Sequence, residues 1–213
     1  MKNIFLLFFM TVATLIAAPK TYIINHSGLM DERAYSKITA IGNEVSTKIG
    51  VEIYLDIKGS NKINPKLPRE QRYKQVKSLE NKLFNDVKGT TTKPFIIITM
   101  AIDQYYTNIL YSNNELKKIV LKDEILDDYI IPLLASHDKN ILKSKVSAAS
   151  LNGYAQIADV LAQNKNIKLE SSIGSGGKVV SEIWKIFMYT MVFIGIISYS
   201  IVVMREKKAK KND

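Results

Sequence analysis

The sequence contains no cysteine. A disulfide framework and a zinc site built from thiolates are therefore excluded. Histidine is almost as scarce: His26 and His137 are the only two, and they lack the His-Glu-x-x-His spacing of metallopeptidases. The Gly-x-Ser-x-Gly motif of serine hydrolases is also missing. These absences remove several common classes of enzyme from consideration.

Positive charge is present without the pattern that nucleic-acid-binding proteins show. Lysine and arginine number 30 against 20 aspartates and glutamates, which gives a formal net charge of +10. Part of the excess lies in the last few residues, and the other basic residues are scattered with few aromatics between them. Nucleic-acid-binding surfaces normally concentrate such residues on one face. The sequence therefore predicts no nucleic-acid partner.

A hydrophobic segment at the N-terminus predicts export. Lys2 is followed by an apolar run that ends at Ala18. A single positive charge, a short apolar core and small residues at its end are typical of a secretory signal peptide, which we place at residues 1–18. An uncleaved signal anchor is the alternative, because cleavage after Ala18 would leave Pro19 as the first residue. Both interpretations carry the following residues across a membrane.

A second hydrophobic segment near the C-terminus predicts a transmembrane helix at residues 183–204. Ile186 to Met204 holds no charged residue, and about 19 residues at ~1.5 Å each approach the ~30 Å of a bilayer core. Five lysines and arginines follow within residues 205–213, and the positive-inside rule places such a tail in the cytoplasm. We therefore expect a single-pass protein of a bacterial inner membrane, in contact with lipid through this helix. Its main domain would be periplasmic and its C-terminus cytoplasmic.

The residues between these segments predict one folded domain at 20–163 and a flexible glycine- and serine-rich linker at 164–181. Helical periodicity covers residues 31–48, 69–84, 123–134 and 139–163, and strands are expected at 51–57, 95–100 and 106–111. In the first strand, apolar residues alternate with polar ones, which predicts a single buried face. The simplest packing is a three-layer α/β sandwich, in which helices cover both faces of a small mixed sheet.

Three short segments resemble the TPM domain family. YIINHSGLMDE at residues 22–32 is similar to the opening of these domains, and TKIGVEI at 47–53 is similar to their step from a helix into a strand. DYIIP at 128–132 resembles their hydrophobic-hydrophobic-Pro sequence near a helix end. The resemblance covers residues 20–163 and implies an α/β sandwich. Members of the family are commonly exported, and many carry one anchor after a low-complexity linker.

The resemblance also implies two kinds of function. Some TPM domains are reported as acid phosphatases or bind calcium. Two loops of this chain differ from the family, because residues 89–94 stand where an Asp-Asn-Gly-like segment is usual and residues 111–114 replace a Gly-Tyr-Gly-like turn. The leading expectation is a binding or accessory module for a membrane-associated complex, with a membrane protein as its partner. A metal-dependent, acid-phosphatase-like hydrolase is the alternative.

One cluster of carboxylates has the chemistry of a cation site. It consists of Asp123, Glu124, Asp127 and Asp128. Residues four apart share a face of an α-helix, so these acids would form two like-charged pairs that a cation could bridge. Their oxygens would suit Ca²⁺ or Mg²⁺, and Asp103 is a further candidate ligand. An acidic cap that complements the helix dipole is the alternative interpretation.

Overall fold

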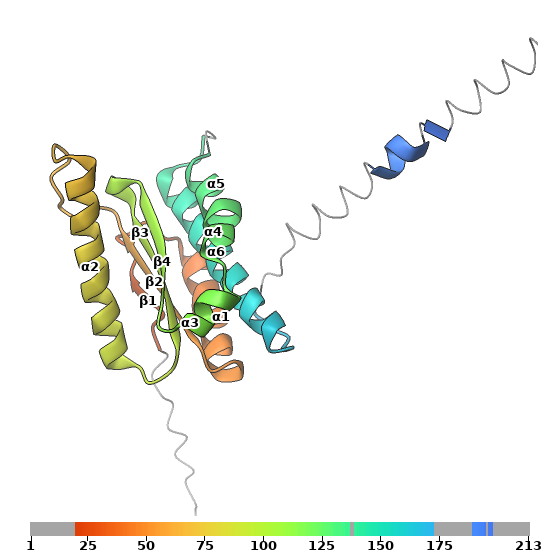
Figure 1. The fold of residues 1–213 in the computed structure, drawn as a ribbon, viewed down its shortest axis with the longest axis horizontal. Coiled ribbons are helices and arrows are strands. Elements are labelled where there is room, and N and C mark those ends of the chain that lie inside the picture. The colour runs from red at the N-terminus through yellow and green to blue at the C-terminus, as the bar shows by residue number, and fades with distance from the viewer. Residues whose placement is uncertain (1–19, 137–138, 173–188, 195, 198–213) are drawn as a thin grey trace, which may run out of the picture.

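The computed structural model describes residues 20–136, 139–172, 189–194 and 196–197. Within them the chain forms an α/β domain around a four-stranded mixed sheet (Figure 1). The strands lie in the order β1 (Ile23–Asn25), β2 (Glu52–Lys58), β3 (Phe95–Ala101) and β4 (Tyr106–Tyr111). The first three are parallel, and β4 is antiparallel to β3. The predicted α/β class with a small mixed sheet is confirmed.

Helices lie on both faces of this sheet (Figure 1). Helix α2 (Arg69–Thr90) covers one face, while α1 (Glu32–Lys48) and α6 (Leu142–Asn164) pack together over the other. Shorter segments complete the domain: η1 (Ile102–Gln104), α3 (Asn114–Ile119), α4 (Lys122–Glu124), η2 (Ile125–Ile130) and α5 (Ile131–Leu134). The arrangement agrees with the expected sandwich.

Helix α1 begins and ends where its sequence predicts. The Asp31 side chain accepts a hydrogen bond from the Ala34 N–H (2.7 Å), which caps the N-terminus. After the last turn, Gly50 has a φ of +79° and donates its N–H to the Val45 carbonyl (3.1 Å). This left-handed conformation suits glycine because it has no Cβ. The chain then turns directly into β2.

Strand β2 is buried on both faces, so the predicted single buried face is wrong. Ile53 and Ile57 are fully buried, but Glu52 and Asp56 on the opposite face are also only 2% and 4% exposed. The reason is tertiary: α2 lies over the face that alternation assigns to solvent. The polar side chains there must find hydrogen-bond partners inside the protein.

The predicted helix at 123–134 is not a regular α-helix. Residues Ile125–Ile130 form a π-helical segment between two short α-helical turns. Pro132 accounts for the interruption, since proline has no N–H and its ring clashes with the carbonyl four residues earlier in an α-helix. A wider π turn relieves this clash. The regular four-residue spacing assumed for the acidic cluster is therefore lost.

The chain after α6 packs back onto the domain. The Ile167 N–H donates to the Ala162 carbonyl (2.9 Å), and Leu169 is buried. The predicted linker at 164–181 therefore begins within a packed segment, and its residues 173–181 lie outside the described part of the chain. The predicted signal peptide and basic tail, and most of the predicted transmembrane helix, also lie outside it. No helix within the described residues has both the length and the apolar character needed to cross a bilayer.

Candidate functional site

A row of polar side chains crosses the sheet near its carboxyl edge, the edge at which β1, β2 and β3 end. The row consists of Asn25, Asp56, Thr99 and Asn108, one residue from each strand in register. Registered neighbours point to the same face of a sheet. Glu80 of α2 hydrogen-bonds to two members of the row, so this is the face that α2 covers.

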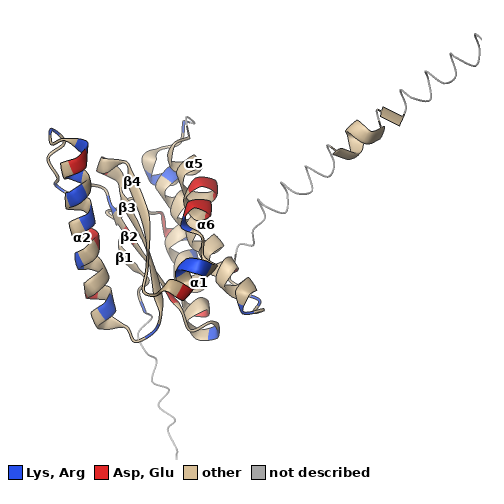
Figure 2. Cartoon of the chain, viewed as in Figure 1, with Lys and Arg blue, Asp and Glu red and all other residues tan. Residues whose placement is uncertain are grey.

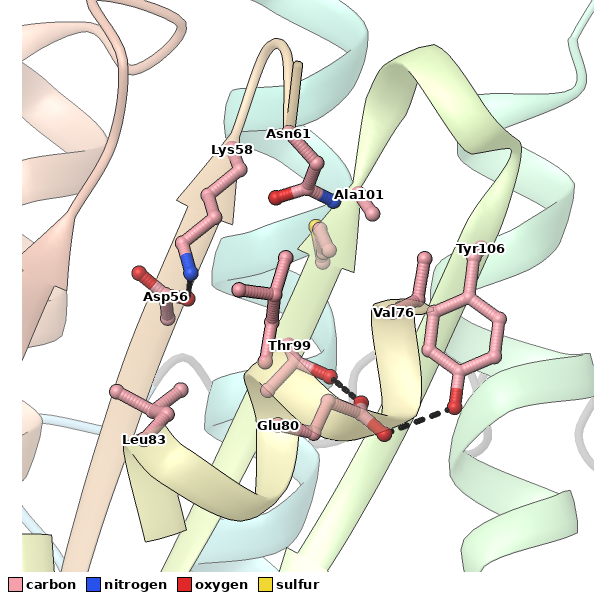
Figure 3. Close-up of a pocket in the computed structure, with 11 residues that line it drawn as sticks. Asp56, Lys58, Asn61, Val76, Glu80, Leu83, Thr99, Ala101 and Tyr106 are labelled. Atoms are coloured by element: carbon pink, nitrogen blue, oxygen red, sulfur yellow. Dashed lines mark hydrogen bonds and ion pairs between the residues drawn. The ribbon is translucent and has the colours of Figure 1, made fainter. Parts of the chain in front are cut away.

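Glu80 is the centre of a buried hydrogen-bond network (Figure 3). Its side chain is only 6% exposed, and its carboxylate accepts hydrogen bonds from the Thr99 hydroxyl, Asn108 Nδ2 (3.0 Å) and the Tyr106 hydroxyl (2.9 Å). Burial raises the pKa of Tyr106, and the negative charge of Glu80 raises it further. Tyr106 therefore stays a proton donor to Glu80 throughout the physiological pH range.

The same network protects the open edge of β4. The Ser112 N–H, just after β4, donates to the Phe95 carbonyl of β3 (2.9 Å). Because successive N–H groups of a strand point in opposite directions, the N–H of Ile109, three residues earlier, points away from the sheet. Asn108 Oδ1 accepts that outward N–H (2.9 Å). An occupied donor cannot pair with another strand. The Asn108 amide thus donates to Glu80 with its nitrogen and accepts the outward N–H of the edge strand with its oxygen.

A small cavity lies beside Glu80. Its volume is about 20 Å³, and its lining includes Asp56, Lys58 and Asn61 (Figure 3). Burial raises the pKa of Asp56, and the Lys58 ammonium, 3.3 Å from Oδ2, offsets part of this rise. The space is sufficient for about one water molecule. A phosphate ester or another organic substrate does not fit.

Two loops are joined at the carboxyl edge by Asp103. Its Oδ2 accepts hydrogen bonds from the Ser60 hydroxyl (3.1 Å) and the Asn61 N–H (3.0 Å), and thereby ties the turn after β3 to the loop after β2. The neighbouring Gln104 accepts a hydrogen bond from Arg72 of α2 (3.2 Å). Oδ1 of Asp103 and Oδ1 of Asn61 are buried without a donor among the described residues, which leaves their lone pairs open to water or a cation.

Backbone strain is concentrated at the same edge. Ser27, Lys62 and Tyr105 have φ angles of 46°, 56° and 50°, and they follow β1, β2 and β3 respectively. A left-handed conformation costs a residue other than glycine on the order of 1 kcal/mol or more. Such residues cluster at ligand-binding sites more often than elsewhere. Among the described residues other than glycine, three of the four with a positive φ therefore lie at the carboxyl edge, and the fourth, Asn166, follows α6.

An apolar groove of about 490 Å³ opens at this edge. Ala101, Ile102 and Tyr105 line one side, and Ile131, Leu134 and Leu142 line the other. Tyr105 is 99% exposed, and Ile131 and Leu142 are 43% and 49% exposed. Tyr106 lines both this groove and the small cavity. The groove thus brings apolar side chains of β3, η1, α5 and α6 together at the carboxyl edge.

Comparison with known proteins assigns no family to this chain. No protein-family model matches it, and no curated protein matches it. The resemblance to TPM domains at residues 22–32, 47–53 and 128–132 stays a prediction from the sequence. Function must therefore be inferred from the geometry of the carboxyl edge.

The four predicted metal ligands lie in the other helical layer. Asp123 and Glu124 belong to α4, and Asp127 and Asp128 belong to η2, which packs against α6 (Figure 2). Burial raises the pKa of Tyr111 to about 12, and the charge of Asp123 adds to this effect. In the part of the chain that the structure describes, no three His, Cys, Asp or Glu side chains are grouped so as to hold a metal ion. Binding of Ca²⁺ or Mg²⁺ by this cluster stays a prediction.

Neither Asp103 nor His26 joins that cluster. Asp103 is engaged with Ser60 and Asn61 on the carboxyl edge. The His26 ring lies edge-on to Tyr35, with ring centroids 5.9 Å apart, as expected for a packed turn residue. The other histidine, at 137, lies outside the described residues.

The sequence analysis did not identify Glu80 and Asp56 as site residues, because they look like ordinary solvent-facing residues of a helix and a strand.

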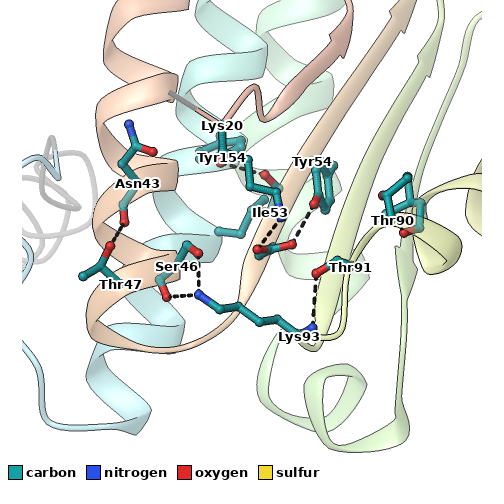
Figure 4. Close-up of polar contacts among 12 residues, drawn as sticks. Lys20, Asn43, Ser46, Thr47, Ile53, Tyr54, Thr90, Thr91, Lys93 and Tyr154 are labelled. Carbon is teal, nitrogen blue, oxygen red and sulfur yellow. Dashed lines mark hydrogen bonds and ion pairs between the residues drawn. The ribbon is translucent and has the colours of Figure 1, made fainter. Parts of the chain in front are cut away.

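A second buried network fastens the chain at the opposite, amino edge of the sheet (Figure 4). Lys20 Nζ lies 2.6 Å from Glu52 Oε1, and the Tyr54 hydroxyl donates to Oε2 (2.7 Å). Burial alone would raise the pKa of Glu52, but the hydrogen bond from Lys20, with help from Thr91 and Tyr54, holds it below its ordinary value. The first described residue is therefore fixed beside the beginning of β2.

The C-terminal exit of the domain is fixed against the C-terminal half of α1, toward the same amino edge. The Glu44 carboxylate accepts hydrogen bonds from the N–H groups of Glu170 (2.8 Å) and Ser171 (2.7 Å) and pairs with Lys48 (2.7 Å). Burial alone would raise the pKa of Glu44. Its hydrogen bonds, led by the one from Lys48, outweigh burial and lower the pKa from 4.5 to about 2. Glu44 thus clamps the chain where it leaves the domain.

Glu44→Gln is expected to destabilise the domain in a pH-dependent way. Because the folded-state pKa lies below the ordinary value, the charged form favours folding above pH 4.5, and this contribution is lost as the pH falls toward 2. We expect a loss of about 1–2 kcal/mol at pH 7 after allowance for solvent screening. Denaturant unfolding is measured at pH 7, 5, 4 and 3. The difference in the free energy of unfolding between the parent chain and Glu44→Gln should narrow below pH 4.5. Glu170→Gln, whose side chain is 87% exposed, is the control, and a pH-independent difference would contradict the clamp.

Proposed function

We propose that this chain is an exported, membrane-anchored, TPM-like domain that acts as a binding or accessory module for a membrane-associated complex. It is anchored in a bacterial inner membrane by the helix predicted at 183–204, with the domain outside the cytoplasm and the tail at 205–213 inside. The uncharged apolar run and the basic cluster after it support this topology. The domain binds its partner through the carboxyl edge of the sheet.

The placement of the chain ends carries this proposal. Lys20, the described residue nearest to the predicted leader, pairs with Glu52 at the start of β2. Before the predicted anchor, Ser171 and Ser172 bond to the C-terminal halves of α1 and α6, which lie toward the same amino edge. The apolar groove and the strained loops lie at the carboxyl edge. Helix α2 runs from one edge to the other over 22 residues, which corresponds to about 33 Å. A domain tethered at its amino edge presents the groove away from the bilayer.

The geometry of the carboxyl edge favours binding over hydrolysis. The cavity beside Glu80 accommodates about one water molecule. Glu80 itself is occupied by three hydrogen-bond donors, which hold α2, β3 and β4 together. The exposed groove is apolar and bordered by an aromatic side chain, a composition typical of protein-binding surfaces. The polar network therefore maintains the shape of the edge that the groove offers to a partner.

One preparation tests both candidate functions. The full chain is reconstituted in nanodiscs, and hydrolysis of a phosphomonoester is measured with Ca²⁺ or Mg²⁺ beside an Asp123→Ala/Asp127→Ala variant. We expect no turnover that depends on these acids. Turnover that disappears in the double variant would establish the hydrolase instead.

Binding is tested in parallel by site-specific cross-linking in cells. A photoreactive residue at position 105 is expected to give a discrete cross-linked protein, whereas the same residue at position 88, on the amino-edge end of α2, should not. Equal cross-linking at both positions would contradict binding through the carboxyl edge.

A further inference from the structure

The amino edge of the sheet carries lysines that come from several segments of the chain. Lys88 lies in the last turn of α2, and Lys93 lies two residues before β3. Lys93 Nζ donates to the Ser46 carbonyl (2.9 Å) and to the Ser46 hydroxyl (2.9 Å). The connection from α2 to β3 is therefore fixed beside the C-terminal part of α1.

Two further lysines follow α6 at the same edge. Lys165 lines a cavity of about 130 Å³ together with Val51 and Pro94, which immediately precede β2 and β3. The Lys168 carbonyl accepts a hydrogen bond from Nζ of Lys48, the last residue of α1 (3.4 Å). These contacts place the end of α6 and the residues after it at the amino edge.

Four exposed lysines at this edge carry charge that the described residues do not balance with ion pairs. We call them the amino-edge lysines: Lys88, Lys93, Lys165 and Lys168. The less exposed carboxylates nearby are already paired, Glu52 with Lys20 (2.6 Å) and Glu44 with Lys48 (2.7 Å). The free positive charges are therefore available to a ligand outside the domain.

Exposed acids of the same segments do not cancel this charge. They are Asp86 of α2, Glu115 of α3 and Glu170 after α6. Helix α3 also carries Lys117 and Lys118, both exposed, and it lines the same cavity as Lys165. The amino edge thus keeps an excess of positive charge.

The distribution of the amino-edge lysines favours an extended anionic surface over a small anion. Of the four, only Lys165 lines the cavity at this edge, and the cavity walls are mostly apolar. A single phosphate needs donors that converge on one point, whereas lysines at the ends of α2 and α6 suit a plane of negative charges. Both ends of the described domain also leave toward this edge, through Lys20 and Ser171.

We infer that the amino edge contacts the anionic phospholipid headgroups of the bilayer that anchors the chain, through the amino-edge lysines. The inference rests on the proposed function, because the helix predicted at 183–204 supplies that bilayer. An anionic bilayer surface attracts each nearby lysine strongly enough to raise the ratio of docked to undocked domain by about fivefold. The contact holds the carboxyl edge and its apolar groove away from the membrane.

Energy transfer to acceptor lipids tests the inference in proteoliposomes that contain the full chain. A fluorophore is attached in Thr92→Cys, an exposed position between two of the amino-edge lysines. The vesicles consist of neutral phosphatidylcholine, either alone or mixed with anionic phosphatidylglycerol. We expect a higher transfer efficiency in the anionic vesicles, and we expect high salt to abolish the rise because it screens surface charge. Equal efficiencies in both vesicles, or a rise that high salt leaves unchanged, would overturn the inference.

Substitutions assign the rise to these lysines. Lys165→Gln/Lys168→Gln should lower the ratio of docked to undocked domain by about 25-fold in anionic vesicles, whereas arginine at both positions should preserve the rise. Lys62→Gln/Lys66→Gln removes the same charge from the loop after β2, at the carboxyl edge, and is the matched control. Circular dichroism checks that each variant folds. Loss of the rise in both glutamine variants, or in neither, would overturn the inference.

Inorganic phosphate distinguishes the bilayer from a small anion. If phosphate reduced the transfer efficiency in anionic vesicles at an ionic strength at which sodium chloride had no effect, the lysines would form a phosphate site and the inference would be overturned.

Failure of this inference and failure of the proposed function give different results. Absence of a lipid effect would leave cross-linking from position 105, and hence the proposed binding module, unchanged. Turnover that depends on Asp123 and Asp127 would instead remove the proposed function itself.

Discussion

Replacing Glu80 with leucine is expected to lower the free energy of unfolding by about 3–5 kcal/mol. The substitution keeps an apolar side chain of similar size but leaves Thr99, Asn108 and Tyr106 without their common acceptor. Two of these donors are buried, and each unsatisfied buried donor costs about 1–3 kcal/mol. Equilibrium unfolding of the full chain in detergent micelles, followed by circular dichroism, measures the change.

Two variants control for the loss of charge and for the helix. Glu80→Gln keeps one side-chain oxygen as an acceptor and should cost less than the leucine variant. Glu70→Leu lies on the same helix, where Glu70 is 78% exposed and pairs only with Lys74 in solvent, and it should change stability by less than about 1 kcal/mol. If Glu80→Leu and Glu70→Leu lowered the free energy of unfolding by the same amount, the network would not hold the carboxyl edge together.

Gly42→Ala is expected to cost about 3 kcal/mol or more, because it overfills a close-packed contact. A Cβ at this position would lie 2.5 Å from the Tyr154 hydroxyl and 2.5 Å from Cδ2 of the Tyr22 ring. Neither ring moves freely, since both are buried and the Tyr154 hydroxyl donates to the Ile53 carbonyl (2.7 Å). The methyl group would therefore force α1 away from the sheet. Thermal and denaturant unfolding would both report the loss.

Gly89→Ala is the matched control for this prediction. Gly89 lies in α2, and a Cβ added there meets no atom within 4 Å. Alanine is preferred to glycine in a helix by about 0.5–1 kcal/mol, so this variant should be neutral or slightly more stable than the parent chain. Equal destabilisation at positions 42 and 89 would contradict the packing that we describe.

Much of the fold could be predicted because local signals agree with the final packing. The helix predicted at 31–48 and the strand predicted at 95–100 both form, and the apolar face of α1 and the continuous apolar run of β3 are buried. Strand β1 was missed because it has only three residues, and α3 because its six residues are too few to show a helical period. Helix α2 extends to Thr90, beyond the predicted end at 84, since the polar residues of its last turns give no apolar pattern.

The candidate site could not be predicted in the same way, because its residues come together only in three dimensions. Asp56 alternates with apolar neighbours, a pattern that normally assigns it to solvent. Glu80 is one of many charged residues on a polar helix. The packing of α2 over β2, β3 and β4 buries both, and neither residue carries a local signal of that packing. The acidic cluster at 123–128 had a clear local pattern, but Pro132 and the π turn alter the spacing on which it depended.

The central claim is that the domain is tethered to a bilayer by its amino edge and directs its carboxyl edge outward. Because the chain has no cysteine, a single fluorophore can be attached in Lys66→Cys, at the carboxyl edge, or in Lys88→Cys, at the amino edge. Energy transfer to acceptor lipids is then measured in proteoliposomes that contain the full chain. We predict clearly more efficient transfer from position 88 than from position 66. Equal or reversed efficiencies would contradict the proposed orientation.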